Sequence, residues 1–155
     1  MSLKRAKEYL KEFGFEDRVM EFPISSKTVK EAAIAIGCRE EEVGKTLSFL
    51  VGDKPILIVV AGTSKIDNHK YKKEFSVKAK MVPVEMLSEV IGHEAGGVCP
   101  FGINDGVAVY LDKSLKKLEN VYPACGSSNS GVKLTVDELE RISNIKGWVD
   151  VCKDM

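Results

Sequence analysis

The sequence predicts one α+β domain over residues 1–155, with a mixed, largely antiparallel, twisted sheet surrounded by helices. Short strand-like runs alternate with amphipathic helical segments along the whole chain. The clearest of them form a hairpin, because the alternating run 46–51 and the apolar run 55–61 flank the turn 52–54. The sequence contains no repeat, linker or low-complexity tract that would divide it into two domains.

Capping residues divide the chain before the hairpin into short elements. Ser2 is expected to cap a first helix, which Gly14 can end because glycine accepts the left-handed conformation. Thr28 and Glu31 have the spacing of a capping box, which predicts a second helix. The expected elements are a helix over 2–13, a strand over 19–22, a helix over 29–36 and a helical turn over 40–42.

The chain from the second hairpin strand onward alternates strands and helices. The run 55–61 is apolar on both faces, which is typical of a central strand. Pro83 suits the first turn of a helix, and Thr135 with Glu138 repeats the capping box. The expected elements are helices over 67–73, 83–91 and 115–118, strands over 78–82, 107–111, 120–124, 132–134 and 148–151, and a helix that begins after Thr135.

Composition excludes several classes of protein. Lys and Arg number 23 and Asp and Glu number 23, so the whole chain has no bulk attraction for nucleic acid or a membrane. The apolar run 55–61 is too short to span a bilayer, and the amphipathic start does not resemble a signal peptide. The stretch 65–80 is locally basic, and it is the best footprint in the sequence for a polyanion such as tRNA.

The cysteines argue against a metal site. Cys38, Cys99, Cys125 and Cys152 have no close pairs, and His93 has no second histidine at ligand spacing. Isolated cysteines of this kind suit reduced thiols, so the sequence predicts a cytoplasmic protein with neither metal nor cofactor.

A glycine-rich loop over 92–102 is the main candidate for chemistry. Its successive N–H groups could form a concavity that binds an anion. Cys99 could act there as a nucleophile with His93 as its base, although a buried thiol is the commoner role of cysteine. A second loop of small residues, 126–131, could complete a polar pocket, and Lys45 could supply a cation.

Three motifs in this order resemble the YbaK/EbsC family, which is similar to the editing insertion domain of bacterial prolyl-tRNA synthetases. They are Glu42-Val43-Gly44-Lys45-Thr46-Leu47, Gly96-Gly97-Val98-Cys99-Pro100-Phe101-Gly102 and Gly126-Ser127-Ser128-Asn129-Ser130-Gly131-Val132-Lys133-Leu134-Thr135. The resemblance covers roughly residues 18–151 and implies a barrel-like sheet. This chain has Asn129 and Ser130 where many members have arginines, which puts that contact with the tRNA backbone in question.

The resemblance implies a site at which Lys45 holds the terminal adenosine or its phosphate and loop N–H groups face the ester carbonyl. The implied catalytic positions are Lys45, Gly97, Val98 and Cys99. The implied substrate-binding positions are Phe22, Thr46, His93, Gly96, Pro100, Gly126, Ser127, Ser130 and Gly131. The family is expected to use backbone donors and substrate groups in place of a protein nucleophile, so Cys99 would contribute through its N–H.

The function that the resemblance implies is hydrolysis of mischarged aminoacyl-tRNA after its release from the synthetase. The expected substrate is tRNA(Pro), or a related tRNA, that carries a small amino acid such as cysteine or alanine. Prolyl-tRNA synthetase is a further expected partner, and the oligomeric state stays open. Two alternatives also stay open: a non-catalytic module that binds a nucleotide, tRNA or a synthetase, and a hydrolase that depends on Cys99.

Overall fold

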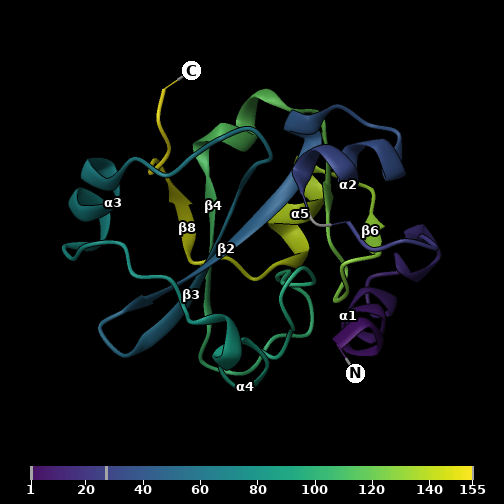
Figure 1. Cartoon of the computed structure of the whole chain (residues 1–155), viewed down its shortest axis with the longest axis horizontal. Helices are drawn as coiled ribbons and strands as arrows, with labels where there is room; N and C mark the ends of the chain where they lie inside the picture. Colours follow the sequence, from purple (N-terminus) through teal and green to yellow (C-terminus); the bar gives the residue numbers. More distant parts are fainter. Residues whose placement is uncertain (1, 27, 155) are drawn as a thin grey trace.

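The computed structural model describes residues 2–26 and 28–154. Six strands form a mixed sheet in the order β7–β5–β2–β3–β4–β8, which curls into a half-barrel (Figure 1). Strands β2 and β3 pair antiparallel at its centre, from Gly44 opposite Ala61 to Val51 opposite Lys54. The strands are β2 (Val43–Val51), β3 (Lys54–Ala61), β4 (Ala108–Asp112), β5 (Asn120–Pro123), β7 (Leu134–Thr135) and β8 (Gly147–Val149). The mixed α+β fold expected from the sequence is confirmed.

A separate two-stranded sheet joins the N-terminal region to the second glycine loop. Strands β1 (Val19–Glu21) and β6 (Ser130–Val132) pair antiparallel, with Met20 opposite Gly131. Phe22 continues this pairing, because its N–H donates to the carbonyl of Asn129 at 2.8 Å and its carbonyl accepts from the Asn129 side chain at 2.9 Å. Asn129, one of the two loop positions at which this chain departs from the arginines of the family that it resembles, therefore has a structural role.

Two of the helices begin where the capping residues Thr28 and Thr135 predict. The Thr28 hydroxyl accepts the Glu31 N–H at 3.1 Å, and Thr135 and Glu138 form a reciprocal capping box. The α-helices are α1 (Ser2–Lys11), α2 (Val29–Ile36), α3 (Asn68–Phe75), α4 (Leu87–Val90) and α5 (Val136–Ile142). The 3-10 helices are η1 (Glu16–Arg18), η2 (Glu40–Glu42), η3 (Val84–Met86) and η4 (Lys113–Lys117). Helix α3 lies on the opposite side of the molecule from α1 and α2 (Figure 1).

Several expected elements differ from the structure, among them the strand expected over 132–134, which is divided between β6 and β7. Ser2 is the first residue of α1, and its hydroxyl donates to the Gly126 carbonyl. The segment 78–82 is an irregular flank of β2, joined to it by a bridge between Met81 and Phe49. The helix expected over 83–91 is divided into η3 and α4. Strand β8 ends at Val149 because the Val151 N–H donates to the Asp112 carboxylate at 2.9 Å.

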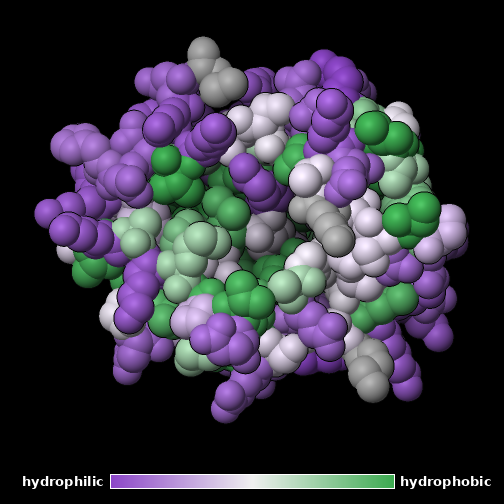
Figure 2. Space-filling view, viewed as in Figure 1, coloured by the Kyte–Doolittle hydropathy of each residue, from purple (hydrophilic) through white to green (hydrophobic). Residues whose placement is uncertain are grey.

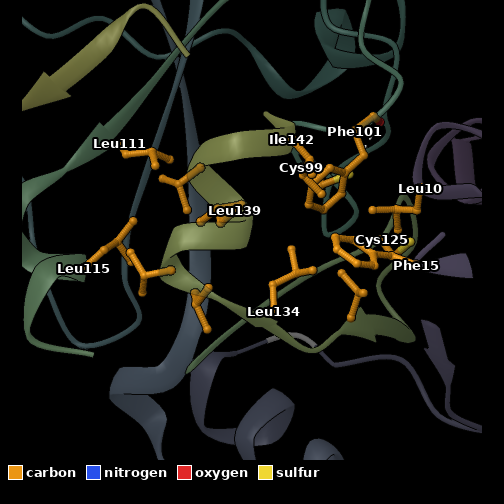
Figure 3. Packing of buried hydrophobic residues seen from close by; sticks show 14 of the residues in the cluster. Leu10, Phe15, Cys99, Phe101, Leu111, Leu115, Cys125, Leu134, Leu139 and Ile142 are labelled. Carbon is orange, nitrogen blue, oxygen red and sulfur yellow. Dashed lines mark hydrogen bonds between the residues drawn. The ribbon is translucent and has the colours of Figure 1, made fainter. Parts of the chain in front are cut away.

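The hydrophobic core occupies both faces of the sheet. On one face, Val59 and Ala61 of β3 pack in a cluster with α1, α5 and the first glycine loop. Figure 3 shows Cys99 and Phe101 of that loop packed near Leu10 of α1. The other face packs Val60 and its neighbours against α3. Within residues 2–26 and 28–154, no helix is long and apolar enough to cross a membrane.

Candidate functional site

A cleft of about 340 Å³ opens where β2 and β5 separate. The two strands pair only at Val43 and Gly44, and beyond that point Lys45, Thr46 and Ser48 of β2 line the floor of the cleft. The edge is covered again at Phe49, where Met81 forms its bridge. Figure 2 shows the resulting hollow in the middle of this face of the molecule.

The two glycine loops form one wall of the cleft, and they touch backbone to backbone. The Gly126 N–H donates to the Gly97 carbonyl at 3.1 Å. A Cβ atom on Gly97 would lie 2.4 Å from the Gly126 carbonyl carbon, and one on Gly96 would lie 2.8 Å from the Ser128 Cβ. Separations below about 3 Å do not occur for real side chains, so this contact requires glycine at both positions.

The donors that this wall can offer include the N–H groups of Gly96 and Val98. Both residues line the cleft, and their N–H groups have no acceptor among the residues that the structure describes. The Gly97 N–H is already used, since it donates to the Glu94 carbonyl at 3.0 Å. The second loop is closed on itself, because the Ser130 hydroxyl donates to the Ser127 carbonyl at 3.0 Å.

Thr46 supplies a polar side chain at the floor of the cleft. It lies opposite Val59 in the β2–β3 ladder, so its side chain is on the face that packs against the first glycine loop. Its Oγ1 is buried and has no hydrogen-bond partner in the described part of the chain. A buried hydroxyl without a partner costs stability, and a ligand that this hydroxyl reached would relieve that cost.

Lys45 borders the same cleft, but its ammonium group turns away from the glycine loops. It lies opposite Val60, whose side chain belongs to the other face of the sheet. Its Nζ donates to the Ser64 carbonyl at 2.6 Å. Burial lowers the pKa of this ammonium group below its usual value. The expected convergence of Lys45 with the loops therefore holds for its backbone and not for its ammonium group.

His93 and Cys99 lie behind the cleft, in the hydrophobic core. Both are fully buried, and the Cys99 Sγ is 3.5 Å from the His93 Nε2. That same Nε2 contacts the Phe101 carbonyl at 2.6 Å. Burial raises the pKa of the Cys99 thiol and lowers that of the His93 imidazole, so both groups stay neutral. A buried neutral thiol does not fit a nucleophile, and the imidazole does not reach the cleft.

The structure thus divides the residues selected from the sequence into two sets. Those that line the cleft are Phe22, Lys45, Thr46, Gly96, Val98 and Ser130. Those behind it are His93, Gly97, Cys99, Pro100, Gly126, Ser127 and Gly131, which shape the loops from outside the lining. The sequence analysis missed the apolar wall made by Val29, Ala32 and Ile36 of α2, together with Tyr122. The apolar periodicity of α2 was visible, but it indicates a core face equally well.

Comparisons with known proteins agree with this geometry. A family model described as an aminoacyl-tRNA editing domain matches residues 25–142. The uncharacterized protein YwhH of Bacillus subtilis (strain 168) is 48% identical over 155 residues, which cover 99% of each chain. The proline–tRNA ligase of Shouchella clausii (strain KSM-K16) is 30% identical over 107 residues, which are 68% of this chain and 18% of that protein.

A solved structure extends the match to the whole fold. The crystal structure of a candidate trans-editing enzyme for prolyl tRNA synthetase superposes with a TM-score of 0.88 at 28% sequence identity, over 99% of this chain and 98% of that chain. The family model alone covers more than half of the residues. The chain therefore belongs to the aminoacyl-tRNA editing domain family.

Proposed function

We propose that this protein is a trans-acting deacylase that hydrolyses the ester bond of mischarged aminoacyl-tRNA. The observation that carries the proposal is a set of unused donors around one cleft: the Thr46 hydroxyl and the N–H groups of Gly96 and Val98. The substrate that we propose is tRNA(Pro), or a related tRNA, that carries a small amino acid such as cysteine or alanine.

Hydrolysis of an aminoacyl ester does not require a nucleophile from the protein, because the ester is already activated. Water attacks the ester carbonyl, the new C–O bond forms, and the carbonyl oxygen gains negative charge. The bond to the terminal ribose oxygen then breaks, and that oxygen takes up the proton that water loses. Donors that face the developing oxyanion are worth about 3–4 kcal/mol each. The Val98 N–H and the Thr46 hydroxyl are the donors that we assign to this role.

The shape of the cleft supports a small amino acid. Val29, Ala32 and Ile36 of α2 form an apolar wall, and Tyr122 lines the cleft with them. A volume of about 340 Å³ has to hold the ester and part of the terminal ribose as well as the side chain. A bulky aminoacyl group therefore has little room beside them.

We propose that Lys45 and a group of lysines on and near α3 contact the tRNA itself. The Lys45 ammonium is partly desolvated against a neutral carbonyl, so a phosphate or ribose oxygen of the acceptor end is a stronger partner for it. Outside the cleft, hydrophilic side chains gather over α3 in Figure 2. Lys70 is held there by Asp150 at 3.2 Å and Asp154 at 2.8 Å, while Lys72 and Lys80 are exposed. Such lysines suit a phosphodiester backbone.

The test is a deacylation screen of tRNAs charged with small amino acids. We expect release of cysteine or alanine from mischarged tRNA(Pro), and no release of proline from correctly charged tRNA(Pro). A Thr46→Val protein purified in the same way controls for a contaminating deacylase. Binding of charged tRNA without release of the amino acid would favour the non-catalytic module and would end the proposal.

A further inference from the structure

Helix α1 contacts the back of the second glycine loop, on the side away from the cleft. The Ser2 hydroxyl donates to the Gly126 carbonyl at 2.6 Å. The Gly126 N–H in turn donates to the Gly97 carbonyl at 3.1 Å. A continuous path of hydrogen bonds therefore runs from α1 through the second loop to the residue that precedes Val98.

The same helix holds the two ends of the first glycine loop. The Arg5 guanidinium donates to the Gly92 carbonyl at 3.3 Å and to the Asn104 side-chain oxygen at 3.1 Å. Asn104 is itself fixed, because its side-chain amide donates to the Glu89 carbonyl at 2.8 Å. Arg5 thus joins the residue where the loop begins to a residue just after it ends.

The backbone of α1 packs in close contact with both glycine loops. A Cβ atom on Gly126 would lie 2.3 Å from the Ser2 carbonyl oxygen, and one on Gly102 would lie 2.7 Å from the Arg5 carbonyl oxygen. Both glycines have positive φ, +87° and +68° respectively. Ala6 and Leu10 anchor the helix to the core, since each is fully buried. The loops therefore rest on a helix that cannot move independently of the core.

Helix α1 also lies outside the part of the chain that the family model matches, residues 25–142. Within the described residues, none of its side chains lines the cleft. Any effect of Ser2 or Arg5 on the reaction must therefore pass through the loops.

We infer that α1 is a brace for the candidate site, in which Ser2 and Arg5 are positioning residues that hold the Gly96 and Val98 donors in place. The catalytic part of this inference rests on the proposed deacylase function. Donors that hold their positions before the substrate arrives need no reorganisation during the reaction. A displacement of about 1 Å can cost a hundredfold in rate, so loss of the brace acts on kcat more than on KM.

The experiment compares Ser2→Ala, Arg5→Ala and the double variant with Lys4→Ala as the matched control. Lys4 lies on the same helix but is exposed, and no hydrogen bond or ion pair joins it to either loop within the described residues. Two quantities are measured: kcat and KM on a mischarged tRNA, and hydrogen exchange of the backbone amides over 93–102 and 125–131. Arg5→Lys and Ser2→Thr, which keep a donor at each position, test for rescue.

We expect the double variant to lose about tenfold or more in kcat, with KM changed less than twofold, and to exchange the loop amides faster. Arg5→Lys and Ser2→Thr should each recover part of the loss. Wild-type kcat and wild-type loop exchange in the double variant would overturn the brace, and so would an equal loss in Lys4→Ala. If the wild-type protein deacylates no tRNA, the proposed function fails, and the loop exchange alone decides the brace.

Discussion

Replacement of Thr46 by valine should make this protein more stable and less active at the same time. The Thr46 Oγ1 is buried in the floor of the cleft and has no partner within the described residues. Valine has nearly the same shape but no hydroxyl, so it removes the group that is costly in the free protein and useful in the complex. Opposite effects on stability and activity are expected for a residue of a functional site, which makes this substitution a test of the site.

The size of both effects follows from the cost of an unmade hydrogen bond. A buried polar group without a partner costs about 1–3 kcal/mol, and the lower end applies because Thr46 borders an open cleft. For a chain of 155 residues, about 1 kcal/mol raises the melting temperature by about 2–4 °C. Loss of one donor to the developing oxyanion should lower kcat/KM by about a hundredfold to a thousandfold.

The assay pairs thermal unfolding with initial deacylation rates on one mischarged tRNA. Thr46→Ser keeps the hydroxyl and should retain most of the activity. Thr63→Val controls for the substitution itself, since Thr63 is exposed and does not line the cleft. A Thr46→Val protein that melts below the wild type and deacylates at the wild-type rate would refute the reasoning.

Three further substitutions test the rest of the site. Lys45→Ala should lower the deacylation rate by about a hundredfold with a small change in melting temperature, and Lys45→Arg should restore part of that rate. A wild-type deacylation rate in Lys45→Ala would remove this residue from the site. Cys99→Ala should keep most of the activity because the thiol lies behind the cleft, and a thousandfold loss with an intact fold would revive the nucleophile. Gly97→Ala should lower both stability and activity, because its Cβ would lie 2.4 Å from the Gly126 carbonyl carbon. Gly147→Ala is the control and should be tolerated, because a Cβ at that position would have no atom within 4 Å. Similar melting temperatures in the two variants would contradict the packing of the loops.

Features that depend on neighbouring residues were predictable from the sequence. The N-cap at Thr28, the capping box at Thr135 and the central β2–β3 hairpin are decided by hydrogen bonds and turns within a few residues. The strand expected over 78–82 was wrong because its structure depends on residues that are distant in the sequence. Its pairing depends on contacts with β2 that lie about thirty residues away, and propensity does not record them.

The sequence predicted several of the residues that line the cleft, but not the direction in which their side chains point. Three motifs in order were enough to bring Lys45, Thr46, Gly96 and Val98 to one cleft. Adjacent residues of a strand point to opposite faces, so Lys45 and Thr46 cannot both face the loops. The sequence carries that alternation but not the side on which the loops will pack. The fold makes that choice, and it selects Thr46.

The burial of Cys99 and the contact of Ser2 with Gly126 also depend on residues that are distant in the sequence. From the sequence alone, a buried thiol is the commoner role for Cys99, but a nucleophile stays open, because burial depends on everything that packs around a side chain. Ser2 reads as a helix cap, yet its hydroxyl binds Gly126, 124 positions further along the chain. Interactions between residues close in the sequence, such as capping hydrogen bonds and turns, decide where helices and strands begin. Contacts between distant segments decide which donors reach the cleft, because only the folded chain brings their partners within hydrogen-bonding distance.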